Sequence, residues 1–238
     1  EERFSRIKHD ASLPIAAARS CFDHAGLCAA DLAALVFYEK PLRKLDRILE
    51  THLAIAPRGA GTFARAIPLV FRERLFVGDD LASALGAPAG RVLYAEHHAS
   101  HAASAFYPSP FEEAAILTID GVGEWATMTF GLGDGNKLDI LGEIRFPHSL
   151  GLLYSAFTYF TGFKVNSGEY KVMGLAPYGE PAYVDAIKTH VIDIKPDGSY
   201  RMNMALFDYV AGLKMTGGKF DALFGGPPRR PESPLSQR

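Results

Sequence analysis

The first 110 residues alternate predicted helices with two short apolar strands. Pro14 and Gly26 bracket residues 15–24, and a proline in the first turn with a glycine past the last is typical of a helix. Residues 41–54 place apolar side chains on one helical stripe. The stripe comprises Leu42, Leu45, Ile48, Leu49 and Leu53. Further helices are expected at 62–76, 79–85 and 96–106, a buried strand at 32–38, and a second strand at 91–95.

From residue 114 onward the pattern favours strands. Three apolar segments, at 114–119, 125–132 and 138–146, predict an antiparallel meander, because Gly, Asp and Asn form a turn signal at 133–136. Ser149 is expected to cap a helix that follows it. The remaining expected elements are helices at 150–160 and 182–190 and a small hairpin of strands 191–194 and 200–204, with a glycine-punctuated segment between the helices.

Composition and charge describe an ordinary globular chain. Lys and Arg number 25 and Asp and Glu 27, so the formal net charge is −2, and apolar residues make up 48%. This near-neutral balance gives no electrostatic footprint for nucleic-acid binding. Two cysteines do not make a disulfide framework, and no apolar run approaches the ~18 residues that a membrane-spanning helix needs. We therefore expect a cytoplasmic protein with neither a nucleic-acid nor a membrane partner.

Three of the eight histidines fall in the segment EHHASH at residues 96–101. On a helix, His97 and His101 are separated by four positions, so both imidazoles project from one face and suit a divalent metal. His98 points about 100° away and need not be a ligand. The alternative interpretation is a helix N-terminus with surface or capping histidines. The HExxH pattern of zinc proteases is absent from this segment.

The segment TIDGVGE at residues 118–124 ends a predicted strand on a carboxylate. Asp120 is a candidate third metal ligand with an oxygen donor. The candidate phosphate-binding residues that follow are Gly121, Val122, Gly123 and Glu124. Glycines there let backbone N–H groups approach an anion closely. The alternative is a plain hairpin turn, since Asp-Gly is a common turn dipeptide.

The segment NSGEYKVMGLAPYG at residues 166–179 mixes polar groups with three glycines. Gly168, Glu169 and Lys171 are candidate cofactor-binding residues. Lys171 can meet a phosphate as a point charge, and Glu169 can contact a ribose hydroxyl or orient a proton transfer. The alternative is a solvated charge pair at a junction between a loop and a helix.

Five segments, taken in order along the chain, carry a family resemblance. They read EHHASHAASAFYPSPF, LTIDGVGEW, FPHSLGLLYSAFTYFTGF, NSGEYKVMGLAPYG and FGGPPRRPESPLSQR. Together they resemble the carbamoyltransferase family of nodulation protein U, which includes antibiotic O-carbamoyltransferases acting on aminoglycosides and cephems. The resemblance implies an α/β chain with the actin-like ATPase (ASKHA, ribonuclease H-like) fold. It also implies that the full-length parent has a YrdC-like domain, and that this domain makes carbamoyladenylate from carbamoyl phosphate and ATP.

The same resemblance implies a metal, Fe²⁺ first and Zn²⁺ as the other possibility, held by His97, His101 and Asp120. It further implies an Asp ligand beyond residue 238 and a general-base histidine before residue 1, so no catalytic base is assigned within the chain. The chain would then comprise part of a first ASKHA subdomain at 1–110 and the start of a second at 111–238. We expect such a truncated chain to be inactive alone.

The leading functional hypothesis is therefore an O-carbamoyltransferase. It would transfer a carbamoyl group from carbamoyladenylate to a hydroxyl of a sugar-like, antibiotic or other secondary-metabolite acceptor, with assistance from the metal. The alternative is a non-catalytic nucleotide- or metal-binding regulatory module of the same fold. A metal-dependent peptidase is a more distant third.

Overall fold

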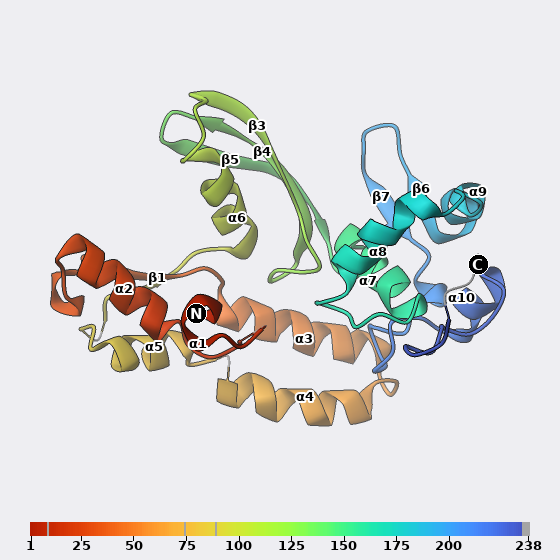
Figure 1. The fold of residues 1–238 in the computed structure, drawn as a ribbon, viewed down its shortest axis with the longest axis horizontal. Helices are drawn as coiled ribbons and strands as arrows, with labels where there is room; N and C mark the ends of the chain where they lie inside the picture. The colour runs from red at the N-terminus through yellow and green to blue at the C-terminus, as the bar shows by residue number, and fades with distance from the viewer. Residues whose placement is uncertain (9, 74, 89, 235–238) are drawn as a thin grey trace.

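The computed structural model describes residues 1–8, 10–73, 75–88 and 90–234, and Figure 1 shows it as a ribbon. Its first part is largely helical. The elements there are α1 (Glu2–Ser5), α2 (Ile15–Ala25), the 3-10 turn η1 (Ala29–Asp31), α3 (Pro41–Ile55), α4 (Ala60–Glu73) and α5 (Val77–Leu85). The helices expected at 15–24, 41–54, 62–76 and 79–85 are thus confirmed with shifted ends, although residue 74 lies outside the described residues.

The two short strands of this first part form a parallel pair. They are β1 (Leu35–Phe37) and β2 (Val92–Tyr94), with Leu35 opposite Val92. The prediction of a buried strand over 32–38 is wrong in length and in burial, because Val36 is 59% exposed. Among the described strands β1 pairs only with β2.

Helix α3 forms where its apolar stripe predicts, but the stripe is not the buried face. Leu42 is 71% and Leu53 is 76% exposed, whereas Pro41 and Arg47 of the same helix are buried. Figure 1 shows α4 running beside α3. The period of the apolar residues therefore predicted the helix correctly and its buried side incorrectly, because burial depends on which elements pack against it.

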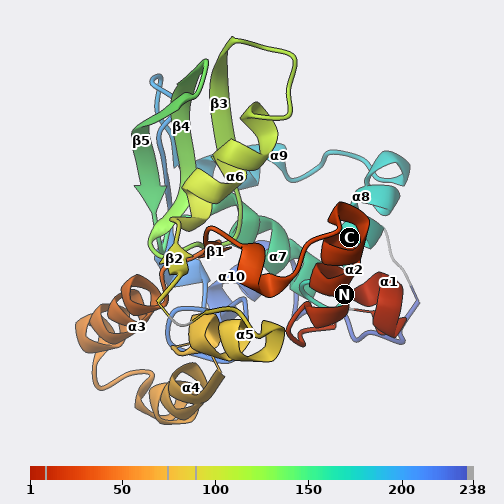
Figure 2. The same cartoon turned by 90° about the vertical axis from the view of Figure 1, so that its left-hand side faces the viewer.

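The predicted meander is confirmed as the sheet β3 (Glu113–Ile119), β4 (Ala126–Asp134) and β5 (Lys137–Arg145). All neighbours are antiparallel, and the register pairs Ile119 with Met128. Helix α6 (His97–Phe106) packs against the sheet, as Figure 2 shows, and buries Ala102 and Phe106 with Ile116. This packing holds the histidine helix beside the end of β3.

The larger core lies in the second part of the chain. It is built by α7 (Leu150–Phe160), β6 (Ile192–Ile194), β7 (Tyr200–Met202), the 3-10 turn η4 (Met204–Leu206) and α10 (Gly218–Leu223). Its centre is Phe220, fully buried, with the rings of Phe157, Phe160 and Phe207 within 6 Å of its own. The helix 150–160 and the hairpin β6–β7 are confirmed, and Ser149 caps α7 by accepting from the backbone N–H of Leu152 at 3.0 Å.

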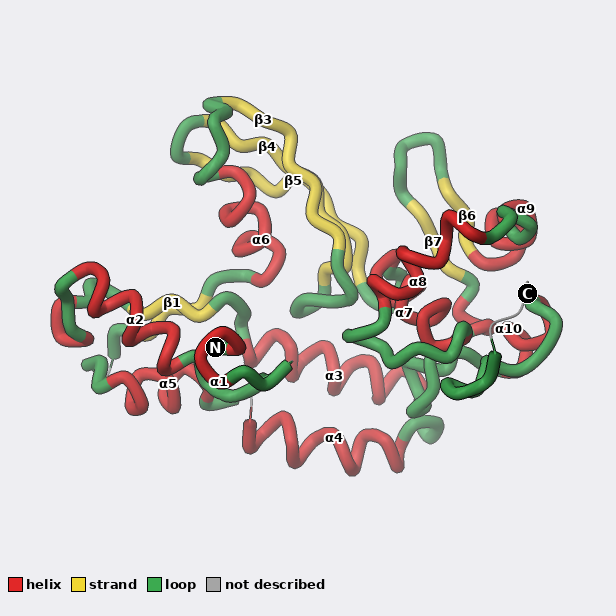
Figure 3. The backbone as a smooth tube through the Cα atoms, in the orientation of Figure 1, coloured by secondary structure: helices red, strands yellow, loops and turns green. Residues whose placement is uncertain are grey.

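The glycine-punctuated segment contains the helix α8 (Glu169–Leu175), labelled in Figure 3, and after it the 3-10 turn η2 (Ala176–Tyr178). The helix expected at 182–190 is confirmed over 184–191, where the α-helical turn α9 (Val184–Ala186) continues as the π-helical turn η3 (Ile187–Val191) before β6. Residues 235–238, which close the last family-like segment, lie outside the described residues.

The architecture is mixed α/β, with a parallel pair, a three-stranded meander and a hairpin joined by helices. The ASKHA assignment and the boundary at residue 110 stay predictions. None of the helices in the described residues is both long enough and apolar enough to cross a membrane.

Candidate functional site

The site forms where the first turns of α6 meet the end of β3. His97 begins α6, and His101 lies one turn further on the same helix. Asp120 directly follows β3 and is fixed by its backbone N–H, which donates to the carbonyl of Thr127 at 3.1 Å. Because α6 packs on the sheet that contains β3, the two histidines and the aspartate come together from separate elements.

The three predicted metal ligands are brought together. One ligand atom from each of His97, His101 and Asp120 lies within 4.8 Å of the others, which no other group of three such residues achieves among those that the structure describes. The Nε2 atoms of the two histidines are 3.0 Å apart, and Asp120 Oδ2 lies 2.9 Å from His97 Nε2 and 3.6 Å from His101 Nε2. Two imidazole nitrogens and one carboxylate oxygen are donors that suit Fe²⁺ or Zn²⁺.

Electrostatics within the cluster keep Asp120 ionised. Burial opposes the charge of Asp120, but hydrogen bonds from His97 and His98 outweigh it and lower the pKa of Asp120 to about 2. The hydrogen bond to Asp120 raises the pKa of His97. Burial, together with the neighbouring charge of His97, lowers the pKa of His101. The cluster thus has an anionic oxygen and a second imidazole biased toward its neutral, ligating form.

His98 is a part of the site that the sequence did not reveal. Its side chain is buried, with Nε2 at 3.1 Å from Asp120 Oδ1 and Nδ1 at 2.5 Å from Thr118 Oγ1. Thr118 Oγ1 in turn lies 2.7 Å from Thr129 Oγ1 on β4. His98 therefore holds the carboxylate oxygen that faces away from His97. Only an inward-facing Thr on β3 could have signalled this contact in the sequence.

Glu124 has a capping geometry that the sequence analysis did not anticipate. Its buried carboxylate accepts from the backbone N–H of His97 at 3.1 Å and from that of Lys40 at 2.8 Å. Lys40 precedes α3 and His97 begins α6, so one carboxylate lies at the N-termini of two helices. Contact between Glu124 and a nucleotide stays a prediction.

Two glycines permit the close approaches that shape the turn after Asp120. A Cβ on Gly123 would lie 2.9 Å from His97 Cβ, and a Cβ on Gly151 would lie 2.2 Å from the carbonyl oxygen of Asp120. Ser149 also donates to the carbonyl of Gly121 at 2.7 Å. The turn is therefore held between α6 on one side and the N-terminus of α7 on the other.

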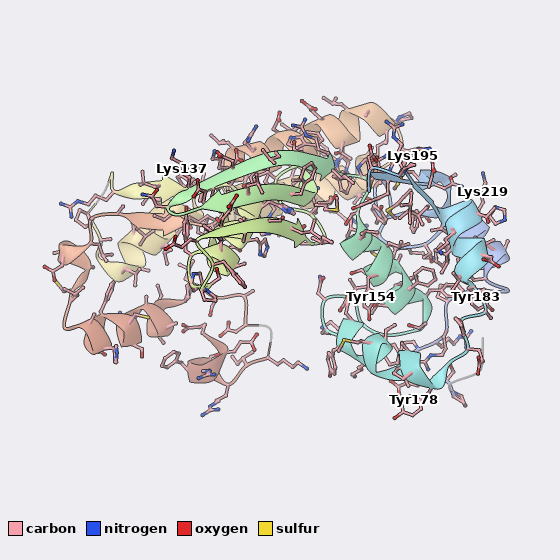
Figure 4. All side chains as sticks on the ribbon, turned by 90° about the horizontal axis from the view of Figure 1, so that it is seen from above. Lys137, Tyr154, Tyr178, Tyr183, Lys195 and Lys219 are labelled. Atoms are coloured by element: carbon pink, nitrogen blue, oxygen red, sulfur yellow. The ribbon has the colours of Figure 1, made fainter. Side chains whose placement is uncertain are left out.

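The third predicted segment is not part of the metal cluster but lies further along α7. The Glu169 carboxylate accepts from Ser155 Oγ at 3.0 Å and from the Asn166 backbone N–H at 2.9 Å. Burial disfavours its charge, but these hydrogen bonds outweigh it and lower the pKa of Glu169. Tyr154, labelled in Figure 4, donates to the Glu169 carbonyl at 3.2 Å. Gly168 is buried at the start of α8, and Lys171 is exposed on it.

A family model described as the N-terminus of carbamoyltransferases matches residues 1–235. The chain belongs to the carbamoyltransferase family. This confirms the family resemblance that the sequence motifs carry.

Relatives of the carbamoyltransferase chain agree with this placement. It is 56% identical over 246 aligned residues to the uncharacterized protein sll1178 of Synechocystis sp., covering 100% of this chain and 40% of that protein. It is 34% identical to the nodulation protein NolNO of Sinorhizobium fredii over 85% of this chain and 28% of that protein. It is 35% identical to the nodulation protein NolO of Bradyrhizobium diazoefficiens over 45% of this chain and 20% of that protein. The chain thus spans less than half the length of these relatives.

Proposed function

We propose that this chain supplies the metal-binding centre of an ATP-dependent O-carbamoyltransferase. The carbamoyl group would pass from carbamoyladenylate, made from carbamoyl phosphate and ATP, to a hydroxyl of a sugar-like or other secondary-metabolite acceptor. The observation that carries the proposal is the convergence of two imidazoles and one carboxylate in a carbamoyltransferase chain. The ASKHA fold and the YrdC-like domain of the parent belong to the same proposal.

His97, His101 and Asp120 would hold the metal, and the donor set fits either iron or zinc. A divalent ion bound there would polarise the carbamoyl carbonyl and offset the negative charge that develops on its oxygen. His98 would keep Asp120 in its ligating orientation, because its Nε2 lies 3.1 Å from the other carboxylate oxygen. The chain would thus contribute both the ligands and a residue that positions one of them.

The turn at Gly121–Gly123 would hold the phosphate of the adenylate. The N-terminus of α7 lies against this turn, and the positive end of its helix dipole favours negative charge there. In the transfer, the carbamoyl carbon gains a bond to the acceptor oxygen and loses its bond to the phosphate oxygen, so AMP leaves as an anion. The hydroxyl proton passes to a base, for which the family resemblance implies a histidine before residue 1. Gly168, Glu169 and Lys171 would contact the nucleotide beyond the phosphate.

Metal analysis of the complete gene product tests the proposal. His97→Ala and His101→Ala should each abolish stoichiometric metal binding and carbamoyl transfer, because each removes one of the three ligands that this chain contributes. His98→Ala should weaken metal affinity about 10–100-fold, the range typical of residues that orient a ligand. His24→Ala is the matched control, because His24 is exposed on α2.

Unchanged metal content and turnover in His97→Ala and His101→Ala would contradict the metal assignment. Metal binding that depends on these residues, without carbamoyl transfer from carbamoyl phosphate and ATP, would instead favour the regulatory module.

A further inference from the structure

A cavity of about 250 Å³ lies on the side of α3 that faces the second part of the chain. Helix α3 and the turn after Asp120 form part of its wall, and Phe146, Leu152 and Tyr209 complete it. Figure 3 shows that the C-terminal end of α3 reaches the loops around α7 and α10. Most of these side chains are apolar, as is common in sites for small organic molecules.

Arg47 is the charged residue of this wall, and within the described residues it has neither a hydrogen bond nor an ion pair. It is only 9% exposed, its guanidinium lies over the ring of Phe146 at 5.0 Å, and its Nε is buried without a hydrogen bond. Within the described residues, no carboxylate lies within ion-pair distance of Arg47. Because an arginine stays protonated at neutral pH, its positive charge has no ion-pair partner there. A buried cation without a hydrogen-bonded anion is costly, so this position calls for a counter-charge.

The nearest carboxylates are engaged elsewhere. Glu39 lies 2.8 Å from Lys44 Nζ, and Glu124 accepts from the backbone N–H groups of Lys40 and His97. Both acidic residues act on Arg47 through space without a hydrogen bond to it. Neither carboxylate therefore takes up a hydrogen-bond donor of the guanidinium.

A second side chain of the wall carries a nitrogen without a partner. His52 lies 2.8 Å through Nδ1 from the carbonyl of Ile48, so Nδ1 carries the proton, and its Nε2 is buried and unpaired. Arg47 and His52 thus each have a buried nitrogen without a hydrogen-bond partner, which fits a cavity that binds a molecule.

The cavity adjoins the proposed metal centre. Val122, in its wall, lies between the two glycines of the turn that follows Asp120. Leu152, also in the wall, approaches the same turn, since a Cβ on Gly121 would lie 3.8 Å from Leu152 Cδ2. The wall of the cavity therefore includes part of the turn that follows Asp120.

We infer that this cavity binds the acceptor, and that the acceptor is a small hydroxylated organic acid. Its carboxylate would pair with Arg47, and its apolar body would contact Phe146 and Leu152. A carboxylate fits better than a phosphate, because one guanidinium balances one negative charge within apolar walls. This inference rests on the proposed function for the role of the molecule, although the binding itself is independent of transfer.

Titration calorimetry on the complete gene product tests the inference with two matched probes, 4-bromobenzoate and its neutral analogue 4-bromobenzamide. The acid should bind about tenfold or more tightly than the amide, because a hydrogen bond to a charged group is lost in the amide. Arg47→Met should abolish this preference, and Arg47→Lys should keep part of it. Arg65→Met, an equivalent change on the exposed surface of α4, should leave the preference intact.

Two calorimetric results would overturn the inference: equal affinity of the native protein for acid and amide, or a preference that survives in Arg47→Met. Anomalous scattering from bromine in a soaked crystal of the native protein is a check that does not depend on a variant that folds. It should place the bromine beside Phe146, and a position elsewhere is a third result that would overturn the inference. Failure of the proposed function would give another result: metal binding and carbamoyl transfer would be missing, while the protein would still bind the acid more tightly than the amide.

Discussion

The segment from α2 to α5 and the segment from α6 to α10 use apolar residues differently. In the second, Phe220 and its aromatic neighbours are buried between α7, the hairpin β6–β7 and α10. In the first, leucines of the predicted stripe on α3 face solvent. A helical period therefore predicts a helix in both segments, but α7 packs its apolar side chains against a core whereas α3 leaves Leu42 and Leu53 exposed.

The site follows the same division. Its ligands stand on α6 and at the end of β3, where α6 packs against the sheet through Ala102, Phe106 and Ile116. Helix α3 instead contributes part of the wall of the adjoining cavity.

Truncating one apolar side chain in each segment should give the largest difference in stability between the two segments. In this chain, Phe220→Ala should lower the free energy of unfolding by about 3–5 kcal/mol, because it leaves a cavity in the larger core. Leu53→Ala, at a side chain 76% exposed, should change it by less than about 0.5 kcal/mol. Urea denaturation measures both. Equal losses of unfolding free energy would mean that the stripe on α3 is covered in solution, and that the two segments do not differ in this way.

Adding one methyl group to a glycine in each segment should give opposite signs. Gly151→Ala should destabilise by about 1–3 kcal/mol, because the new Cβ meets the Asp120 carbonyl. Gly61→Ala, on α4 with open space around it, should stabilise by roughly 0.4–1 kcal/mol. Thermal unfolding gives the sign, and metal affinity should fall in Gly151→Ala alone. A stable Gly151→Ala with native metal affinity would show that the turn is less tightly held than described.

A pH series should reveal the smallest effect. His148 Nδ1 accepts from the Met202 backbone N–H at 3.1 Å, and burial with the charge of Arg201 lowers its pKa in the folded chain. The unfolded chain then binds the proton more readily, so stability is full above the ordinary pKa of 6.5 and declines as the pH falls below it.

The unfolding free energy should therefore fall less between about pH 7.5 and about pH 5.5 in His148→Asn than in the native chain. His24→Asn, on exposed α2, serves as the control and should keep the native pH dependence. If the pH dependence of the unfolding free energy is unchanged in His148→Asn, this histidine does not contribute to it.

Much of the candidate site could be read from the sequence because its signals are local. The four-residue spacing of His97 and His101 and the strand that ends at Asp120 both depend on short-range geometry. The contact of His98 with Thr118 and the capping by Glu124 could not be read, because each joins segments that meet only after α6 packs on the sheet. Helix α8 was not predicted because it is only seven residues long and lies among glycines at 168, 174 and 179.

The sequence by itself determined most of the helices and strands, the two histidines on one helical face, and membership of a transferase family. Those properties follow from hydrophobic period, turn residues and motif order, all of which act along the chain. Only the tertiary structure decided which apolar faces are buried, which oxygen of Asp120 faces which histidine, and where Arg47 lies buried without an ion pair. Burial and hydrogen bonding depend on which residues pack together in the folded chain, and a local sequence pattern does not predict those residues.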